Sequence, residues 1–182
     1  MSTATTTNEP QVWIGCLACY NAGRLVGEWF PAVGADEVTL AQVHRSAGGA
    51  RFGCEELWVM DHEHIPVRGE MDTTTAAAWG EAYQQAPDGL WEAVCAWVDS
   101  GAYVAAADAS TPSLGDFEER YTGQWDSFED YAEHLAGELD LFDGWPETAR
   151  RYFDWTKWVN DLRYDYTVCD APGGGVYVFR DL

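Results

Sequence analysis

Apolar residues in the first third of the chain gather in short runs that predict strands. Three such runs, rich in β-branched and aromatic residues, occupy residues 11–20 (QVWIGCLACY), 24–33 and 55–60. Residues 36–46 have the spacing of a short intervening helix. We therefore expect a small antiparallel sheet with one helix, forming an N-terminal domain over residues 11–70.

Helical spacing replaces this pattern over residues 73–107. Apolar side chains recur three and four positions apart on both sides of Pro87-Asp88-Gly89, which predicts two helices with a break between them. Gly101 is a candidate stop for the second helix, and the STPS sequence at 110–113 is typical of a linker. The pattern predicts a central helical domain over residues 71–112.

The last third of the chain mixes helical spacing with a terminal hairpin. Residues 116–121 predict a helical turn closed by Gly123, and residues 126–142 and 146–162 predict longer helices. The inward-facing residues expected on the two longer helices are Phe128, Tyr131, Ala132, Leu135 and Leu139, then Tyr152, Trp155, Val159 and Leu162. Ser127 followed by Asp130 suits an N-terminal cap. Residues 164–169 and 176–179 predict a hairpin, which completes a C-terminal α+β domain over residues 113–182.

The N-terminal segment and the cysteines indicate a cellular location. Residues 1–10 (MSTATTTNEP) are polar, lack the features of a secretory signal, and predict a disordered tail. No apolar run approaches the roughly 18 residues of a membrane helix. Five scattered cysteines are typical of reduced thiols rather than of a disulfide framework. We therefore expect a cytoplasmic protein.

The charge balance excludes several kinds of partner. The 182 residues include 31 Asp and Glu against 10 Lys and Arg, a net charge of −21, which excludes direct binding to nucleic acid and disfavours anionic membranes. A hydrophobic content of 47% with 10 Trp argues against disorder. Residues 69–149 hold 18 of the acidic residues and one base, Arg120. Salt adaptation would spread acid over the whole surface, so this concentration favours a local function.

Candidate metal and catalytic motifs are weak. Cys16 and Cys19 have zinc-knuckle spacing, and His62 and His64 are candidate partners. Residues three positions apart on a strand point to opposite faces, however, so we expect buried free thiols, solvated loop histidines, no metal and no cofactor. The sequence contains no nucleophile elbow, phosphate loop or zinc-protease motif, so we expect no enzyme activity.

The acidic residues are themselves the strongest candidate site. Asp126, Glu129, Asp130 and Glu133 follow helical spacing, which predicts one stripe of carboxylates opposite the apolar face. The pattern extends through further acidic residues on both sides: Asp116, Glu118, Glu119, Glu138, Asp140, Asp143 and Glu147. A line of carboxylates a few ångströms apart resembles the phosphate backbone of DNA. That backbone has one charge per roughly 3.4 Å of helix axis on each strand. We expect such a surface to bind proteins that normally bind DNA.

Several ordered motifs resemble the ArdA family of antirestriction proteins. They are IGCLACYN at 14–21, GRLVGEW at 23–29, EELWVMD at 55–61, FEERYTG at 117–123, FEDYA at 128–132, YFD at 152–154 and GVYVFR at 175–180. The resemblance covers nearly the whole chain from about Val12, and the ordered combination is far more specific than any single motif.

The resemblance implies a fold and a function. Members of this family are elongated, curved α+β proteins of three small domains that dimerise through the third domain. They mimic bent duplex DNA and occupy the DNA groove of type I restriction–modification enzymes, which blocks restriction and often modification. They usually travel on mobile genetic elements.

Two other classes of function stay open at this stage. An acidic inhibitor or immunity protein for a nuclease would carry similar charge but would bind one cognate toxin. A carbohydrate-active enzyme would depend on one or two carboxylates, and spacing alone cannot select them from 31.

Overall fold

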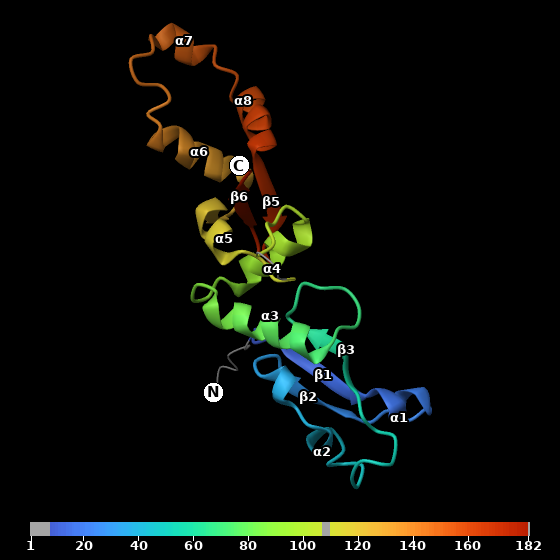
Figure 1. Ribbon diagram of the computed structural model, residues 1–182. Helices are drawn as coiled ribbons and strands as arrows, with labels where there is room; N and C mark the ends of the chain where they lie inside the picture. Colours follow the sequence, from blue (N-terminus) through green and yellow to red (C-terminus); the bar gives the residue numbers. More distant parts are fainter. Residues whose placement is uncertain (1–7, 107–109, 182) are drawn as a thin grey trace, which may run out of the picture. The chain divides into compact units, whose positions relative to one another are not determined.

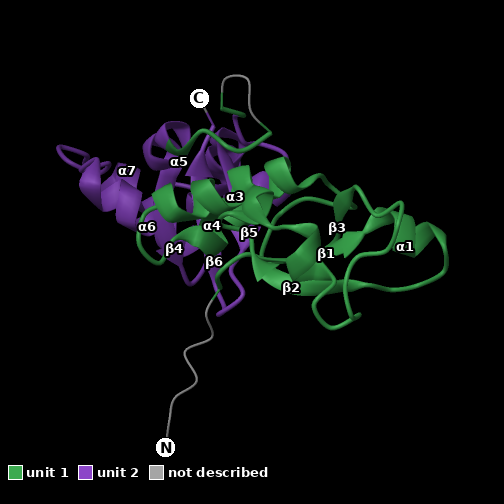
Figure 2. Ribbon diagram, turned by 60° about the horizontal axis from the view of Figure 1, so that its bottom comes forward, with its two compact units in different colours: residues 1–95, 105–114 green, residues 96–104, 115–182 purple. Residues whose placement is uncertain are grey.

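The computed structural model describes residues 8–106 and 110–181, and it shows an α+β protein with two three-stranded antiparallel sheets. This confirms the predicted fold class. The chain forms two compact units (Figure 2). Unit 1 comprises the described residues up to Cys95 together with residues 105–114, and unit 2 comprises residues 96–104 and 115–182. The division into three domains at 11–70, 71–112 and 113–182 stays a prediction.

The sheet of unit 1 has its first strand in the centre. Strand β1 (Gln11–Cys16) lies between β2 (Gly27–Pro31) and β3 (Leu57–Glu63), and both pairings are antiparallel. Val12 and Ile14 of β1 are fully buried, because the side chains of alternate residues share one face of a strand. The predicted N-terminal sheet is confirmed (Figure 1).

The predicted strand over residues 11–20 is wrong in its second half. The strand ends at Cys16, and Leu17–Asn21 form helix α1, whose last turn is closed by the Ala22 N–H bonding to the Ala18 and Cys19 carbonyls. A short apolar run is compatible with either a strand or a buried helix, so periodicity could not separate them. Because the chain turns into α1 after Cys16, Cys16 and Cys19 do not lie on opposite faces of one strand.

The predicted helix over residues 36–46 is also shorter than expected. A 3₁₀ turn, η1 (Ala35–Glu37), precedes helix α2 (Leu40–Val43). Thr39 caps α2 in a reciprocal capping box with Gln42, which satisfies two N–H groups at the helix start. The next regular element is β3, so residues 44–56 form a segment without helix or strand.

The two central helices agree with the prediction. Helix α3 (Thr73–Gln85) is capped by Asp72, whose carboxylate accepts from the Thr75 N–H at 2.7 Å, and this bond lowers the pKa of Asp72. Helix α4 (Trp91–Ser100) ends before Gly101, which has a φ of 78°. Gly80 of α3 lies so close to the main chain of Val33 that a Cβ there would clash.

The predicted disordered tail falls only partly on described residues. Residues 1–7 lie outside them. Residues 8–10 contact unit 1, because Asn8 donates to the Glu92 carboxylate at 2.6 Å and the buried Pro10 accepts from the Ala32 N–H at 2.9 Å. The predicted tail over residues 1–10 therefore stays a prediction, and its last three residues include two that make hydrogen bonds within unit 1.

The sheet of unit 2 contains the predicted terminal hairpin. Strand β6 (Val176–Arg180) lies between β4 (Tyr121–Trp125) and β5 (Tyr166–Asp170), with antiparallel pairing on both sides. A 3₁₀ turn, η2 (Arg163–Asp165), precedes β5. Gly175 has a φ of 78° and no room for a Cβ against the Trp125 carbonyl, so the hairpin approaches β4 closely at this point.

Helix α5 (Leu114–Arg120) differs from the predicted helical turn over residues 116–121. Tyr121 begins β4 rather than continuing the helix, and Gly123 lies in that strand, where the pairing register shifts, with a φ of 128°. Gly123 therefore marks a strand irregularity and not a helix stop.

The two long helices are both shorter than predicted. Helix α6 (Phe128–Glu138) starts at its confirmed Ser127 cap, and Leu139 after it is 62% exposed instead of facing inward. Residues 146–162 contain two helices, α7 (Glu147–Arg151) and α8 (Trp155–Leu162). The Asp154 carboxylate caps α8, and the break leaves Tyr152 83% exposed, contrary to the prediction.

Aromatic side chains build the interior of unit 2. Trp97, Phe117 and Phe179 are buried with ring centroids 5.8–6.1 Å apart. A second cluster lies under α6 and comprises Phe128, Tyr131, Ala132, Val159 and Val178. Burial raises the pKa of the Tyr131 phenol in this cluster.

Among residues 8–106 and 110–181, no helix has both the length and the apolar character of a membrane span.

Candidate partner-binding surface

All eleven predicted carboxylates lie in residues 116–147 of unit 2. They occupy three places: α5, the segment from Asp126 through α6, and the segment from Asp140 to Glu147, which is the first residue of α7 (Figure 1). Ten of the eleven side chains are exposed, namely Glu118, Glu119, Asp126, Glu129, Asp130, Glu133, Glu138, Asp140, Asp143 and Glu147, and Asp116 is half-buried. We refer to these eleven residues as the acidic surface.

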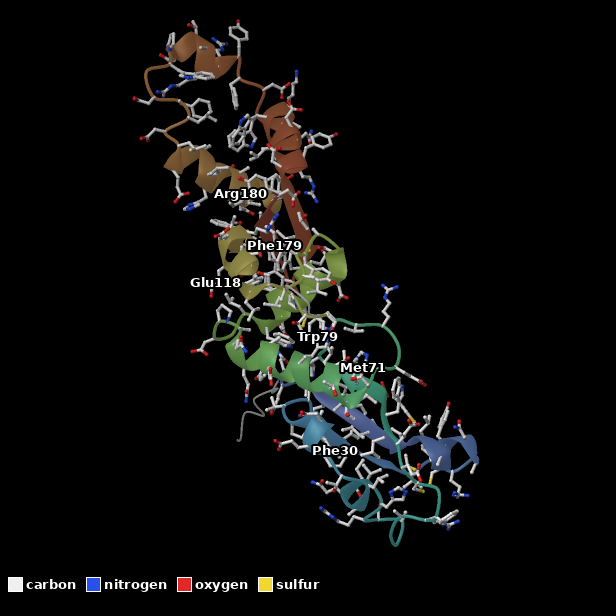
Figure 3. All side chains as sticks on the ribbon, in the orientation of Figure 1. Phe30, Met71, Trp79, Glu118, Phe179 and Arg180 are labelled. Atoms are coloured by element: carbon white, nitrogen blue, oxygen red, sulfur yellow. The ribbon has the colours of Figure 1, made fainter. Side chains whose placement is uncertain are left out.

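Helix α5 orients its acidic residues by burying one aromatic ring. Phe117 is fully buried and stacks on Tyr121 with ring centroids 5.2 Å apart. Glu118 and Glu119 follow it on the other side of this short helix and are exposed. Figure 3 shows Glu118 directed outward from α5, whereas Phe179 lies in the interior of the unit. Burial of Phe117 thus fixes which side of α5 carries the charge.

Helix α6 carries the largest group of these carboxylates. Glu129, Asp130 and Glu133 are exposed on the helix, at spacings that put neighbouring Cβ atoms about 5–6 Å apart. Asp126 precedes the cap, so the predicted helical stripe of four is wrong in its first member. Glu129 and Asp130 lie in the first turn, where the helix dipole favours negative charge and offsets their mutual repulsion.

Two of these carboxylates have side-chain partners within the helix. Ser127 donates its hydroxyl to Asp130 at 2.5 Å and accepts from the Asp130 N–H at 3.2 Å. Glu138 lies 3.4 Å from the His134 Nε2 atom, one helical turn earlier. Both partners lie within one helical turn of the carboxylate that they contact, so these two carboxylates are oriented by local contacts.

Several arginines of unit 2 are engaged elsewhere. Arg120 donates to the Arg180 carbonyl at 3.4 Å, and Arg150 donates to the Phe142 carbonyl at 2.6 Å. The Arg163 guanidinium lies 5.4 Å from the centre of the Phe128 ring. These guanidinium groups therefore stabilise the fold through main-chain oxygens and an aromatic ring.

The two units have similar net negative charges, but within unit 2 the acidic residues are unevenly distributed along the sequence. Residues 115–147 hold eleven acidic residues and one base, whereas residues 148–182 hold five of each. Unit 1 as a whole has 14 acidic and 4 basic residues, and unit 2 has 17 and 6. The acid-rich stretch over residues 69–149 thus crosses both units, and its densest part coincides with the acidic surface.

The sulfur and histidine candidates form a second group, in unit 1. Cys16 and Cys19 were expected on opposite faces of a strand, and that premise is wrong because α1 starts at Leu17. Their sulfur atoms gather with His44 and Cys54. Sequence spacing could not reveal the last two partners, because 24 residues separate Cys19 from His44.

The two histidines considered with the cysteines lie elsewhere. His62 is half-buried in β3, so its expected place in a loop is wrong. His64 follows the strand, is exposed, and accepts through its carbonyl from the Trp91 Nε1–H at 2.9 Å. Its side chain is solvated, as expected.

Comparison with known families identifies the chain. The family model of the antirestriction protein ArdA matches residues 12–177. The chain therefore belongs to the ArdA family, which confirms the resemblance seen in its motifs. No curated protein matches the chain in sequence.

Proposed function

We propose that this ArdA-family protein inhibits type I restriction–modification enzymes by presenting the acidic surface in place of DNA phosphates. Family membership supports an antirestriction role. The observation that carries the mechanism is the density of exposed carboxylates over residues 116–147, with Arg120 as the one base in that stretch. Glu129, Asp130 and Glu133 lie within about 6 Å along the axis of α6. This charge density is of the same order as the one charge per roughly 3.4 Å of axis on each DNA strand.

The physical basis of inhibition is electrostatic competition. A groove that binds duplex DNA is lined with basic residues, and a dense negative surface is attracted to it over about one Debye length, roughly 8 Å at physiological salt. Binding also releases counterions, as DNA binding does. Because the acidic surface has many members, affinity is distributed over weak contacts instead of depending on one residue.

We also propose that the protein acts as a homodimer in the cytoplasm of the cell that contains the restriction enzyme. Three aromatic side chains of unit 2 are exposed, Trp145, Tyr152 and Tyr164. The family resemblance implies dimerisation through the C-terminal domain, where a partner subunit would cover rings of this kind. Light scattering should give twice the 20.2 kDa of one chain, and a clean monomer at micromolar concentration would contradict the dimer.

Competition with duplex DNA tests the inhibitory mechanism. Increasing amounts of the protein should displace a labelled duplex from a purified type I methyltransferase, and the affinity should fall severalfold or more between low and moderate salt. A flat salt response would overturn DNA mimicry, since apolar contacts would then dominate. Failure to displace DNA, together with tight binding to a nuclease, would favour the immunity-protein alternative.

A further inference from the structure

Four potential metal ligands from three separate parts of unit 1 meet at one point. Cys16 ends β1, Cys19 lies in α1, His44 follows α2, and Cys54 lies in the segment before β3. One ligand atom of each residue lies within 4.8 Å of all the others. Cys16, Cys19 and His44 are buried and Cys54 is half-buried, so an ion could reach the cluster from the Cys54 side.

Two distances within this cluster match the edges of a tetrahedral metal centre, and the other ligand atoms lie within 4.8 Å of one another. A Zn²⁺ ion with Zn–S of about 2.3 Å and Zn–N of about 2.05 Å sets tetrahedral edges of about 3.8 Å between sulfurs and about 3.6 Å between sulfur and nitrogen. The Cys19 and Cys54 sulfurs are 3.7 Å apart, and the Cys19 sulfur is 3.6 Å from the His44 Nε2 atom. A disulfide would require about 2.05 Å between sulfurs.

The hydrogen bonds of His44 select the tautomer that a metal requires. Its Nδ1 atom lies 2.9 Å from the Leu40 carbonyl oxygen, which can only accept, so Nδ1 carries the proton. The Nε2 lone pair then faces the three thiols. A second-shell carbonyl that holds a histidine in this way is a regular feature of zinc sites.

The surrounding charge favours thiolates over thiols. The Arg24 Nη2 atom lies 3.7 Å from the Cys19 sulfur. Three thiolates, a neutral imidazole and Zn²⁺ have a net charge of −1, which the guanidinium of Arg24 would balance.

The cluster also accounts for a long irregular segment. Residues 44–56, between α2 and β3, contain no helix or strand, and such segments are uncommon in small compact domains. Main-chain bonds attach it to α1, where the Leu17 N–H donates to the Glu56 carbonyl at 3.1 Å (Figure 1). A metal bound by His44 and Cys54 would fix this segment to the end of β1 and to α1.

We infer that Cys16, Cys19, His44 and Cys54 form a structural Zn²⁺ site that joins three segments of unit 1. All four positions of the tetrahedron are filled by the protein, which is the arrangement of a structural rather than a catalytic zinc. Binding displaces the remaining thiol protons to solvent. A disulfide between Cys19 and Cys54 is the competing outcome, and it would leave the oriented imidazole and the third thiol without a role.

Metal analysis of the full chain tests this inference. Protein purified under reducing conditions from zinc-supplemented cells should contain one zinc per chain by mass spectrometry of the metal. Exchange into Co²⁺ should give the visible bands of a tetrahedral ion and thiolate-to-cobalt charge transfer. The Cys54→Ser variant should weaken Zn²⁺ binding by more than the 10- to about 100-fold that loss of an outer-shell partner costs. Cys54 is the least buried ligand, so this change perturbs packing least.

A matched control separates the site from general effects of removing thiols. Cys95 is also half-buried, but its sulfur lies 3.8 Å from the His64 carbonyl, outside the cluster. Cys95→Ser should therefore retain one zinc per chain. Zinc-free protein without tetrahedral cobalt bands, a Cys19–Cys54 disulfide in protein prepared with zinc under reducing conditions, or equal zinc loss in both variants would overturn the inference. These measurements need no restriction enzyme, so their failure is distinct from failure of the proposed inhibition.

Discussion

The two units reach nearly the same net charge with different interiors. Unit 2 is organised by large aromatic rings, with Trp97, Phe117 and Phe179 in mutual contact beneath α5 and the sheet. Unit 1 combines a small aliphatic sheet, in which Val12, Ile14 and Val59 are fully buried, with a smaller aromatic group formed by the buried Trp79 and Trp91 of α3 and α4. Residues 44–56 of unit 1 lie outside any helix or strand, and they contribute His44 and Cys54 to the cysteine–histidine cluster.

This difference shows how a dense charge can coexist with a stable fold. A buried aromatic ring contributes more apolar area than an aliphatic side chain, so a few rings can outweigh the repulsion of exposed carboxylates. Repulsion between carboxylates on one helix costs only some tenths of a kcal/mol per pair. In unit 2 the core and the charged surface are therefore nearly independent. In unit 1 we expect part of the order to depend on the cluster.

The largest effect on stability should come from the aromatic interior of unit 2. Replacing Phe117 by Ala should destabilise the fold by about 3–5 kcal/mol, because it removes a fully buried ring with three aromatic neighbours. Urea denaturation measures this. The control is Phe52→Ala, which changes a fully exposed ring in unit 1 and should alter the free energy of unfolding by no more than about 0.5 kcal/mol. Equal losses would disprove the assignment of the core.

Removing four charges should separate function from stability. Changing Asp126, Glu129, Asp130 and Glu133 together to Asn or Gln should weaken restriction inhibition by about tenfold or more, since each exposed contact contributes about 0.2–1 kcal/mol. The melting temperature should change little, because relief of repulsion is offset by the lost interaction with the α6 dipole. A restriction-protection assay beside thermal melts measures both quantities.

The matched control for this variant lies in unit 1. Neutralising four exposed carboxylates there changes the net charge equally, and the residues are Glu55, Glu56, Asp61 and Glu63. Inhibition should fall less than in the unit 2 variant. An equal fall would mean that total charge matters and that the acidic surface has no special role.

A smaller effect is expected at the edge of the second cluster. Leu135 is half-buried and packs against the buried residues beneath α6, so Leu135→Ala should cost about 1–2 kcal/mol, less than the 2–5 of a fully buried site. Leu139→Ala, at an exposed position four residues on, should be nearly neutral. Chemical denaturation of the pair tests whether the apolar face of α6 ends at Leu135.

The smallest effect should come from one charge. Glu129→Gln should change inhibition by no more than about fivefold, because a single screened contact is worth less than the 1.4 kcal/mol of a tenfold change. Titration in the restriction-protection assay measures it. Complete loss of protection with an unchanged melt would replace distributed mimicry with a single essential residue.

The sequence by itself predicted a helix cap, a break and a turn that depend on residues only a few positions apart. The cap at Ser127, the break at Pro87-Asp88-Gly89 and the terminal hairpin all follow from residues within a few positions of each other. The family could also be predicted, because its motifs occur in a fixed order along the chain. The exposure of most of the acidic surface followed from the periodicity of charge and apolar residues.

Only the tertiary structure shows where a short apolar run changes from strand to helix, and which distant residues its side chains then contact. The apolar run after Cys16 is compatible with a strand or a helix, and the hydrogen bonds that close α1 decided between them. That turn brings Cys19 to within 3.7 Å of Cys54, a residue 35 positions away. Spacing along the sequence cannot predict that these two sulfur atoms lie close together. Their proximity depends on how separate segments pack, and not on the pattern within any one segment.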